Sequence, residues 1–484
     1  MTFLQKRNKV VLGVALLAVF SGCTKIWDDH NQLTDKNLGM NLYQAISQTA
    51  GLGKFSDMLV KSGYDKIIAS SKTYTVWAPN DQALQSLDPA ILNDTTKLKQ
   101  FVGNHISNQS YLTGALNPVQ RIQMLNGKYN NATSTAFDSA TIVTPNQYAA
   151  NGVFHTINKF IPRYDNCWEF LKNSTAVPLM KSLLLSLNYI YFDSTKATQT
   201  GVDPNTGTPL WDSTNAKIVR NVFLDSAQDV SNEAGQYTLV LLTDAGYNTE
   251  LNLLKPYFNY PIPDSVNKWA GFHLVKDFAF KGFYPPSSLP TIPVSKFGVH
   301  VPLNPANLVA SYKTSNGIVY VMNDVPLVGF ADKFPPIIIQ GENPLFFVAD
   351  RGANTFYRIR KDSLGNVFND IYLQNYNYAS YYIGYRARGI YSTKYNVSWV
   401  ALNDVQTTPL WQQKLVMDSV SNPTSFPYVT VPYNRFAEVA LGQWSSGTFY
   451  RSGMIMYVVG PTAASSTGGN NSISLDYIKL TPLP

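Results

Sequence analysis

The stretch FVGNHISNQSYLTG, Phe101 to Gly114, recurs in outline farther along the chain as WAGFHLVKDFAFKG, Trp269 to Gly282. Laid on each other without a gap, the two stretches share an aromatic residue, two glycines and a histidine. The two histidines, His105 and His273, are among only five in the chain. A pattern that returns in this way predicts a structural unit that the chain uses twice.

Two further segments are repeated in the same order around these histidines. TYTVWAP, Thr73 to Pro79, is a β-rich run stopped by a proline, and its counterpart is QYTLVLLTDAGYN, Gln236 to Asn248. NGVFHTINKFI, Asn151 to Ile161, has the pattern of a strand after a tight Asn-Gly turn, and its counterpart is SNGIVYVMNDVPL, Ser315 to Leu327. The spacing between the first and the last segment is nearly the same in both copies. We therefore expect two copies of one fold.

In order and spacing, the three segments resemble the signature segments of fasciclin-like domains. The resemblance implies compact α/β domains, each a β-wedge or sandwich flanked by helices, over residues 38–164 and 165–330. The second copy departs from the first, because its TDAGYN lacks the proline of APND and because residues 192–215 form an insertion rich in turn formers. We expect the second copy to keep the fold.

His105 and His273 each lie on a predicted helix beside an aromatic residue and a glycine. Because the histidine stands in both copies, where duplicated catalysis is not expected, we interpret both residues as structural. A buried histidine that donates a ring hydrogen bond to a backbone carbonyl would join the helix to the sheet. In animal fasciclin-like proteins the corresponding tyrosine–histidine region is linked to receptor adhesion, and here Asn104 and Phe272 stand where that tyrosine would be.

A second kind of pattern begins after Phe330. The paired prolines of KFPPIII mark a boundary, because they cannot continue a helix or a central strand. Over residues 334–484, short β-rich runs alternate with Gly, Pro and Asn, as in a sandwich or jelly roll. The ending SISLDYIKLTPLP resembles the last strand of galactose-binding-like modules of carbohydrate-binding proteins. The expected fold class is therefore multidomain, two α/β fasciclin-like domains followed by an all-β jelly-roll sandwich.

The segment LQNYNYASYYIGYRARGIYSTKYNVSW, Leu373 to Trp399, is rich in aromatic residues. Aromatic faces stack on the apolar faces of sugar rings, while Asn and Arg bind the hydroxyl groups. Strand alternation along YYIGYRARGIY would bury one set of its tyrosines in the sandwich. The ligand-binding candidates are therefore Tyr376 and Tyr378, in the Asn-rich approach to the strand, and Trp411 and Trp444 near turns.

The first 22 residues have the pattern of a signal peptide. Lys6, Arg7 and Lys9 precede an apolar run from Val10 to Phe20. This run is too short to cross a bilayer as a helix, which takes about 20 apolar residues.

The end of the signal, Phe20-Ser21-Gly22-Cys23, resembles the lipobox of bacterial lipoproteins, in which the cysteine is acylated and becomes the mature N-terminus. Two or more acyl chains anchor a protein stably. Asp28 and Asp29 resemble the surface-export signals of some Gram-negative lipoproteins. The resemblance implies a lipidated tether over residues 23–37 and a protein held by outer-membrane lipid, facing the cell exterior. An ordinary secreted protein in which Cys23 is incidental stays open as the alternative.

Several functional classes are disfavoured by the sequence. Three positive charges of the formal +7 lie in the signal, and the rest are dispersed, which argues against nucleic-acid binding. With Cys23 lipidated, Cys167 has no cysteine partner for a disulfide, a zinc site or a redox pair. The HExxH, GxSxG and P-loop patterns are absent. We expect no catalytic residue, no metal and no cofactor.

The resemblances together imply a function in binding. Lipoproteins of this kind often accompany TonB-dependent glycan-uptake systems. We expect a surface-exposed, non-enzymatic glycan-binding accessory to a starch-utilisation-type uptake complex. Its ligand would be a polysaccharide or oligosaccharide, and its partners would be a TonB-dependent transporter and that transporter's surface lipoproteins. The alternative is an adhesion or complex-assembly protein that acts through the fasciclin-like domains. A glycoside-cleaving enzyme ranks third.

Overall fold

The computed structural model describes residues 36–462 and 471–484, except for residues 213, 327–328, 351, 363, 375 and 422–425. The signal peptide, Cys23 and most of the tether 23–37 lie outside the described residues, so lipidation stays a prediction. Among the described helices, none combines the length and the apolar character needed to cross a membrane.

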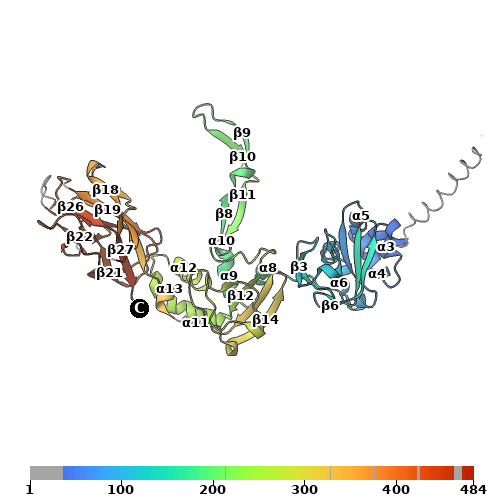
Figure 1. Cartoon of the computed structure of the whole chain (residues 1–484). Helices are drawn as coiled ribbons and strands as arrows, with labels where there is room; N and C mark the ends of the chain where they lie inside the picture. Colours follow the sequence, from blue (N-terminus) through green and yellow to red (C-terminus); the bar gives the residue numbers. More distant parts are fainter. Residues whose placement is uncertain are drawn as a thin grey trace, which may run out of the picture. The chain divides into compact units, whose positions relative to one another are not determined.

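The chain divides into two compact units (Figure 1). The first contains the described residues up to Asn166, together with the short segments 232–234 and 314–316. The second contains the rest of the described chain from Cys167 onward.

The first unit packs short helices against one sheet. Its helices are α3 (Leu42–Ser47), α4 (Gly53–Ser62), α5 (Tyr64–Ile68), α6 (Pro89–Leu92) and α7 (Thr95–Gly103). The sheet order is β2 (Ile106–Ser107), β1 (Tyr74–Pro79), β7 (Gly152–Ile157), β6 (Ala140–Ala149), β5 (Ala136–Phe137), β4 (Tyr129–Ala132) and β3 (Gln120–Gln123). The apolar face of α4, with Phe55 and Leu59 fully buried, packs in one core with Val76 of β1 and Phe154 of β7.

The pairing of β1 with β7 joins the two ends of the first domain. The strands run parallel, from Tyr74 opposite Gly152 to Pro79 opposite Ile157. Gly152 has φ 155°, and a Cβ added there would lie 2.1 Å from the carbonyl oxygen of Tyr74. Only glycine fits so close an approach. The side chain of the preceding Asn151 accepts a hydrogen bond from the backbone N–H of Leu42 at 2.8 Å, which fixes the start of α3.

The second unit repeats this arrangement. Its sheet order is β13 (Ala279–Lys281), β12 (Tyr237–Leu242), β15 (Gly317–Met322) and β14 (Leu308–Thr314), the order of β2, β1, β7 and β6 in the first unit. Tyr237 lies opposite Gly317 in a parallel pair, and a Cβ on Gly317 would lie 1.9 Å from the carbonyl oxygen of Tyr237. The predicted repeat is therefore confirmed down to the strand register.

A threonine at the second position of each central strand makes the same pair of hydrogen bonds in both copies. The hydroxyl of Thr75 donates to the carbonyl of Gln109 at 2.6 Å and accepts from the backbone N–H of Tyr111 at 2.8 Å. The hydroxyl of Thr238 donates to the carbonyl of Gly282 at 2.9 Å and accepts from a backbone N–H at 3.1 Å. The repeated TYT and QYT sequences thus tie the strand to the returning chain in the same way.

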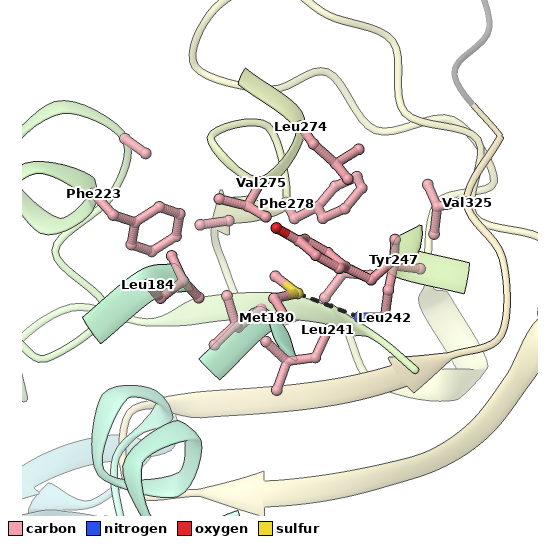
Figure 2. Packing of buried hydrophobic residues seen from close by; sticks show 14 of the residues in the cluster. Met180, Leu184, Phe223, Leu241, Leu242, Tyr247, Leu274, Val275, Phe278 and Val325 are labelled. Carbon is pink, nitrogen blue, oxygen red and sulfur yellow. Dashed lines mark hydrogen bonds between the residues drawn. The ribbon is translucent and has the colours of Figure 1, made fainter. Parts of the chain in front are cut away.

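Helices on the second sheet enclose an apolar core (Figure 2). They are α8 (Cys167–Asn173), α9 (Pro178–Ser186), α10 (Val222–Ser226), α11 (Asp244–Leu254) and α12 (Pro263–Val275). Met180 of α9 reaches the sheet, where its sulfur accepts the backbone N–H of Leu242 at 3.4 Å (Figure 2). Cys167 is buried in this core.

The insertion in the second copy forms a β arm longer than the expected 192–215. β8 (Asn188–Phe192) pairs with β11 (Lys217–Asn221), and β9 (Thr198–Val202) pairs with β10 (Pro209–Asp212) (Figure 1). The turn formers lie between these strands, as their chemistry favours. Most of the arm is exposed, including several large apolar side chains, among them Ile190, Phe192, Trp211 and Val219.

The remaining chain is all β after α13 (Phe330–Lys333). One sheet has the order β16 (Ile337–Gln340), β27 (Tyr477–Pro482), β21 (Lys394–Val400) and β24 (Val439–Ser445). A second has β17 (Phe346–Phe347), β20 (Tyr382–Ala387), β25 (Met454–Val459), β22 (Gln412–Met417) and β23 (Val429–Thr430), and a third has β18 (Thr355–Lys361), β19 (Val367–Gln374) and β26 (Ser472–Leu475). Their inward side chains form a separate core. The expected class, two α/β fasciclin-like domains followed by an all-β sandwich, is confirmed.

Replacing Gly152 with alanine should destabilise the first unit by about 2–3 kcal/mol, because the new Cβ would overlap the Tyr74 carbonyl. Hydrogen exchange of β1 and β7 peptides, followed as denaturant is added, measures the loss. Gly114→Ala is the matched control, since a Cβ at Gly114 meets nothing within 4 Å. Equal protection in the two variants would contradict the assigned role of Gly152.

Candidate functional site at the loop end of the sandwich

Three segments of the sandwich meet at one end, which we call the loop end: residues 376–381, 426–428 and 460–462. The backbone N–H of Ser380 donates to the carbonyl of Pro461 at 2.8 Å, and that of Gly460 donates to the carbonyl of Tyr381 at 2.8 Å. The hydroxyl of Tyr428 donates to the carbonyl of Gly460 at 3.1 Å. These bonds hold three loops from distant parts of the sequence in one place.

Tyr378 is the exposed aromatic residue of this end, with 39% of its surface accessible. Its ring stands at 86° to the ring of Tyr381, with the centroids 5.9 Å apart. Tyr381 is fully buried, and its hydroxyl donates to the carbonyl of Ala349 at 2.5 Å. A buried, anchored ring therefore supports an exposed one, which limits the freedom that Tyr378 would lose on binding a ligand.

The backbone around Tyr378 adopts a costly conformation. Asn377 has φ 50° and Ser380 has φ 52°, both in the left-handed region that non-glycine residues rarely adopt. Such residues collect at ligand-binding loops, where surrounding contacts hold them in place. Here the bond from Ser380 to Pro461 supplies one of those contacts.

Tyr428 belongs to the site although the sequence analysis did not select it. Its half-buried ring lies 5.0 Å from the ammonium of Lys414, and burial raises the pKa of its hydroxyl. A neutral tyrosine hydroxyl can both donate and accept hydrogen bonds. The one signal in the sequence was the turn-forming run before it, SNPTSFP, which resembled many other turns.

Tyr376 was predicted to bind ligand, and the structure corrects this prediction. Only 1% of its surface is exposed, and its ring packs 4.8 Å from that of Tyr381. A Cβ at Gly460 would lie 1.9 Å from the Tyr376 hydroxyl, so the glycine makes room for this tyrosine. Tyr376 is a core residue that supports the loop end from below.

The predictions for Trp411 and Trp444 are wrong for the same reason. Trp411 is 1% exposed, lies 5.8 Å from the ring of Tyr372 and directs its indole N–H to Gln413 at 3.4 Å. Trp444 is 7% exposed and stacks on Tyr395, its partner across the strands, at 5.6 Å. Both tryptophans are close to turns in sequence but point into the sandwich.

His105 has both ring nitrogens engaged in the first domain. Nδ1 donates to the carbonyl of Phe101 at 2.9 Å, and Nε2 accepts the backbone N–H of Ile161 at 3.0 Å. The second bond requires an unprotonated Nε2, so the Nδ1–H tautomer is fixed. Burial lowers the pKa of His105 to about 4, which keeps the ring neutral. The ring joins the end of α7 to the chain that follows β7.

His273 occupies the matching place in the second domain with a different partner. Its Nε2 donates to the carbonyl of Lys333 at 2.9 Å, and its ring stacks on Phe334 with the centroids 5.0 Å apart. Burial first, and then the charges of Lys333 and Lys276, lower the pKa of His273 well below its ordinary value. This histidine holds the segment that leads into the sandwich.

A buried carboxyl lies at the start of the last strand. Burial raises the pKa of Asp476 to about 7, and the charges of Asp370 and Glu342 add to the effect. Asp370 itself is fully buried and is held by the guanidinium of Arg358. Among the described residues, no group of three or more His, Cys, Asp or Glu side chains is placed to hold a metal ion.

Comparison with known proteins supports the first domain most directly. The fasciclin domain family matches residues 50–162. No curated protein matches the chain.

Solved structures share low sequence identity with the chain. The fasciclin domain pair of the insect cell adhesion molecule fasciclin I is 16% identical, covering 58% of this chain and 98% of its own, with a TM-score of 0.22. The CBM6 domain of a laminarinase from Zobellia galactanivorans is 14% identical, covering 30% and 98%, with a TM-score of 0.20. A family 35 carbohydrate-binding module from Clostridium thermocellum is 16% identical, covering 31% and 98%, at 0.20. At these scores the likenesses carry no argument about the site, which depends on its own geometry.

The charge of Asp476 should make the sandwich less stable as the pH rises. Its folded pKa of about 7 lies above the ordinary 3.8, so the unfolded state loses this proton first, and stability falls between about pH 4 and pH 7. Asp476→Asn should therefore raise the melting temperature at pH 8 and leave it nearly unchanged at pH 4, in buffer with a chelator. Asp418→Asn, at an exposed position, is the control and should have little effect. A lower melting temperature for Asp476→Asn at pH 8 would contradict the expectation.

Proposed function

We propose that the protein binds glycans without cleaving them and that the loop end of the sandwich holds the sugar. The observation that carries this proposal is Tyr378, an exposed ring backed by the buried Tyr381 and set in strained backbone. The apolar face of a sugar ring stacks on an aromatic ring, and neighbouring amides and hydroxyls bind its hydroxyl groups. Asn377 and Ser380, close to Tyr378 in the chain, would supply such groups.

The composition of the loop end favours binding over hydrolysis. Glycoside hydrolases use two carboxyl groups about 5–10 Å apart. The described residues of the loop end include neither Asp nor Glu. Asp476 lies after β26 and is buried, which keeps it from facing a sugar at Tyr378. We therefore place the protein among binding proteins.

Its proposed location follows from the N-terminal sequence. Residues 1–22 would be removed as a signal, and acyl chains on Cys23 would anchor the protein in the outer membrane, facing outward. In that position a glycan-binding sandwich would serve as an accessory to a TonB-dependent, starch-utilisation-type uptake complex. It would hold polysaccharide near a transporter and its partner lipoproteins.

The alternative is a protein that assembles with others through its fasciclin-like domains, and the β arm favours it. Ile190, Phe192, Trp211 and Val219 are each exposed by nearly half or more of their surface. Exposed apolar ribbons with open strand edges are typical of surfaces that dock another protein. A cavity of about 380 Å³ at the base of the arm, with Trp168 in its wall, would add to such a surface.

Replacing Tyr378 with alanine should weaken glycan binding at least about tenfold, or ~1.4 kcal/mol, because the stacking ring is lost. The measurement is affinity electrophoresis of the whole protein through gels that contain α-glucans, β-glucans or xylans. Tyr357→Ala is the matched control, since this tyrosine is 59% exposed but lies on β18, outside the loop end.

If no polysaccharide retards the wild-type protein, and a membrane protein co-purifies with it through the β arm, the assembly function is correct instead. Equal retardation of Tyr378→Ala and the wild type would place the sugar elsewhere.

Cys23→Ala should move the protein from the membrane fraction to the soluble fraction, because no acyl chain can then be attached. Cys167→Ala is the matched control: Cys167 is buried in the second domain, so this variant should stay with the membrane. Fractionation followed by mass spectrometry of the N-terminal peptide makes the measurement. An unmodified Cys23 in the wild-type protein would refute the anchor.

A further inference from the structure

A lysine and an aspartate meet inside the second domain, far along the chain from each other. Asp277 follows the end of α12, and Lys333 is the last residue of α13. Nζ of Lys333 lies 2.5 Å from Oδ2 of Asp277, and the two side chains are 3% and 0% exposed. Two oppositely charged groups in such a dry place carry a large desolvation cost.

The surroundings of Asp277 are apolar on one side and hydrogen-bonded on the other. Leu274, Val275 and Phe278, its neighbours in the chain, pack into the apolar core (Figure 2). The hydroxyl of Ser295 donates to Oδ1 of Asp277 at 2.6 Å. The two carboxyl oxygens therefore differ: Oδ1 receives a hydroxyl, and Oδ2 faces the amine.

A small cavity adjoins the pair. Asp277 and Lys333 both line it, together with Val299, Val301 and Val325. Its volume of about 10 Å³ is close to the space that one water molecule requires. A second carboxyl, that of Glu250 on α11, is 3% exposed, and its charge acts on Lys333.

We propose that Nζ of Lys333 and Cγ of Asp277 are joined by an isopeptide bond that forms within the folded domain. Three requirements are met by contact or by space: an amine against a carboxyl, a hydroxyl on the oxygen that will remain, and room for one water.

The reaction balances without any cofactor. A proton passes from the ammonium to Oδ2, which converts two buried charges into neutral groups. Burial lowers the pKa of Lys333 to about 8, which makes the free amine easier to form. The free amine attacks Cγ, and the Ser295 hydroxyl stabilises the charge that develops on Oδ1. The second amine proton passes to Oδ2, the C–Oδ2 bond breaks, and one water leaves.

The product keeps one of the hydrogen bonds that Nζ makes to the backbone. Nζ of Lys333 lies 2.6 Å from the carbonyl of His273 and 3.3 Å from that of Leu274 at the end of α12. These carbonyls hold Nζ in place before the reaction, and the single N–H of the new amide can still donate to His273. The bond would close a covalent loop from Asp277 to Lys333, at the point where the second domain leads into the sandwich.

The test is the intact mass of the denatured full chain. The wild-type protein should be lighter by one water than the mass calculated for its processed chain, and a tryptic digest should contain a branched peptide joining Asp277 to Lys333. Lys333→Arg should restore the full mass. Lys276→Arg, which changes the neighbouring lysine, should keep the loss.

The wild-type measurement decides the matter even if a variant fails to fold. Folded wild-type protein of full mass would show that the pair remains an ion pair, and the proposal would fall. Loss of water without the branched peptide would overturn it equally.

Discussion

The architecture of both fasciclin-like domains depends on one close contact between parallel strands. At the start of β7, Gly152 passes so near the carbonyl of Tyr74 that a side chain has no room, and Gly317 does the same against Tyr237. The contact brings the last strand of each domain beside the first, so the intervening helices and strands must close over the sheet. In the first domain the side chain of Asn151 accepts the backbone N–H of Leu42, so the start of α3 is held beside the same contact. A motif of a few residues therefore sets the topology of more than a hundred.

The two copies have different structural roles. In the first, His105 joins α7 to the chain after β7. In the second, aromatic residues continue the core into the sandwich: the ring of Phe258 lies 4.9 Å from that of Phe449, and Phe334 lies 4.7 Å from Tyr391. Backbone hydrogen bonds from Phe449 and Ser392 support this junction. Because the second domain and the sandwich form one compact unit, the loop end is held on a firm base, which suits a site that binds an extended polymer.

Sequence reasoning identified the repeat, the domain order and the β character of the C-terminal part, because each of these depends on local patterns. Asn-Gly pairs, β-rich runs and prolines determine the backbone conformation of the few residues around them. Burial of single aromatic residues depends instead on what lies across the sandwich. Trp411 and Trp444 were predicted to be exposed because they lie near turns in the sequence. In the structure both are buried in the sandwich. Tyr428 was not predicted as a site residue, because its place in the site depends on contacts among three loops that are distant in sequence.

The central functional claim is that a glycan is bound at the loop end rather than along the β arm of the second domain. Hydrogen–deuterium exchange of the whole protein with and without a retarding polysaccharide tests it most directly. Slower exchange confined to peptides covering residues 376–381, 426–428 and 460–462 is the result expected. Slower exchange in residues 188–221, with the loop end unchanged, would contradict the assignment of the site.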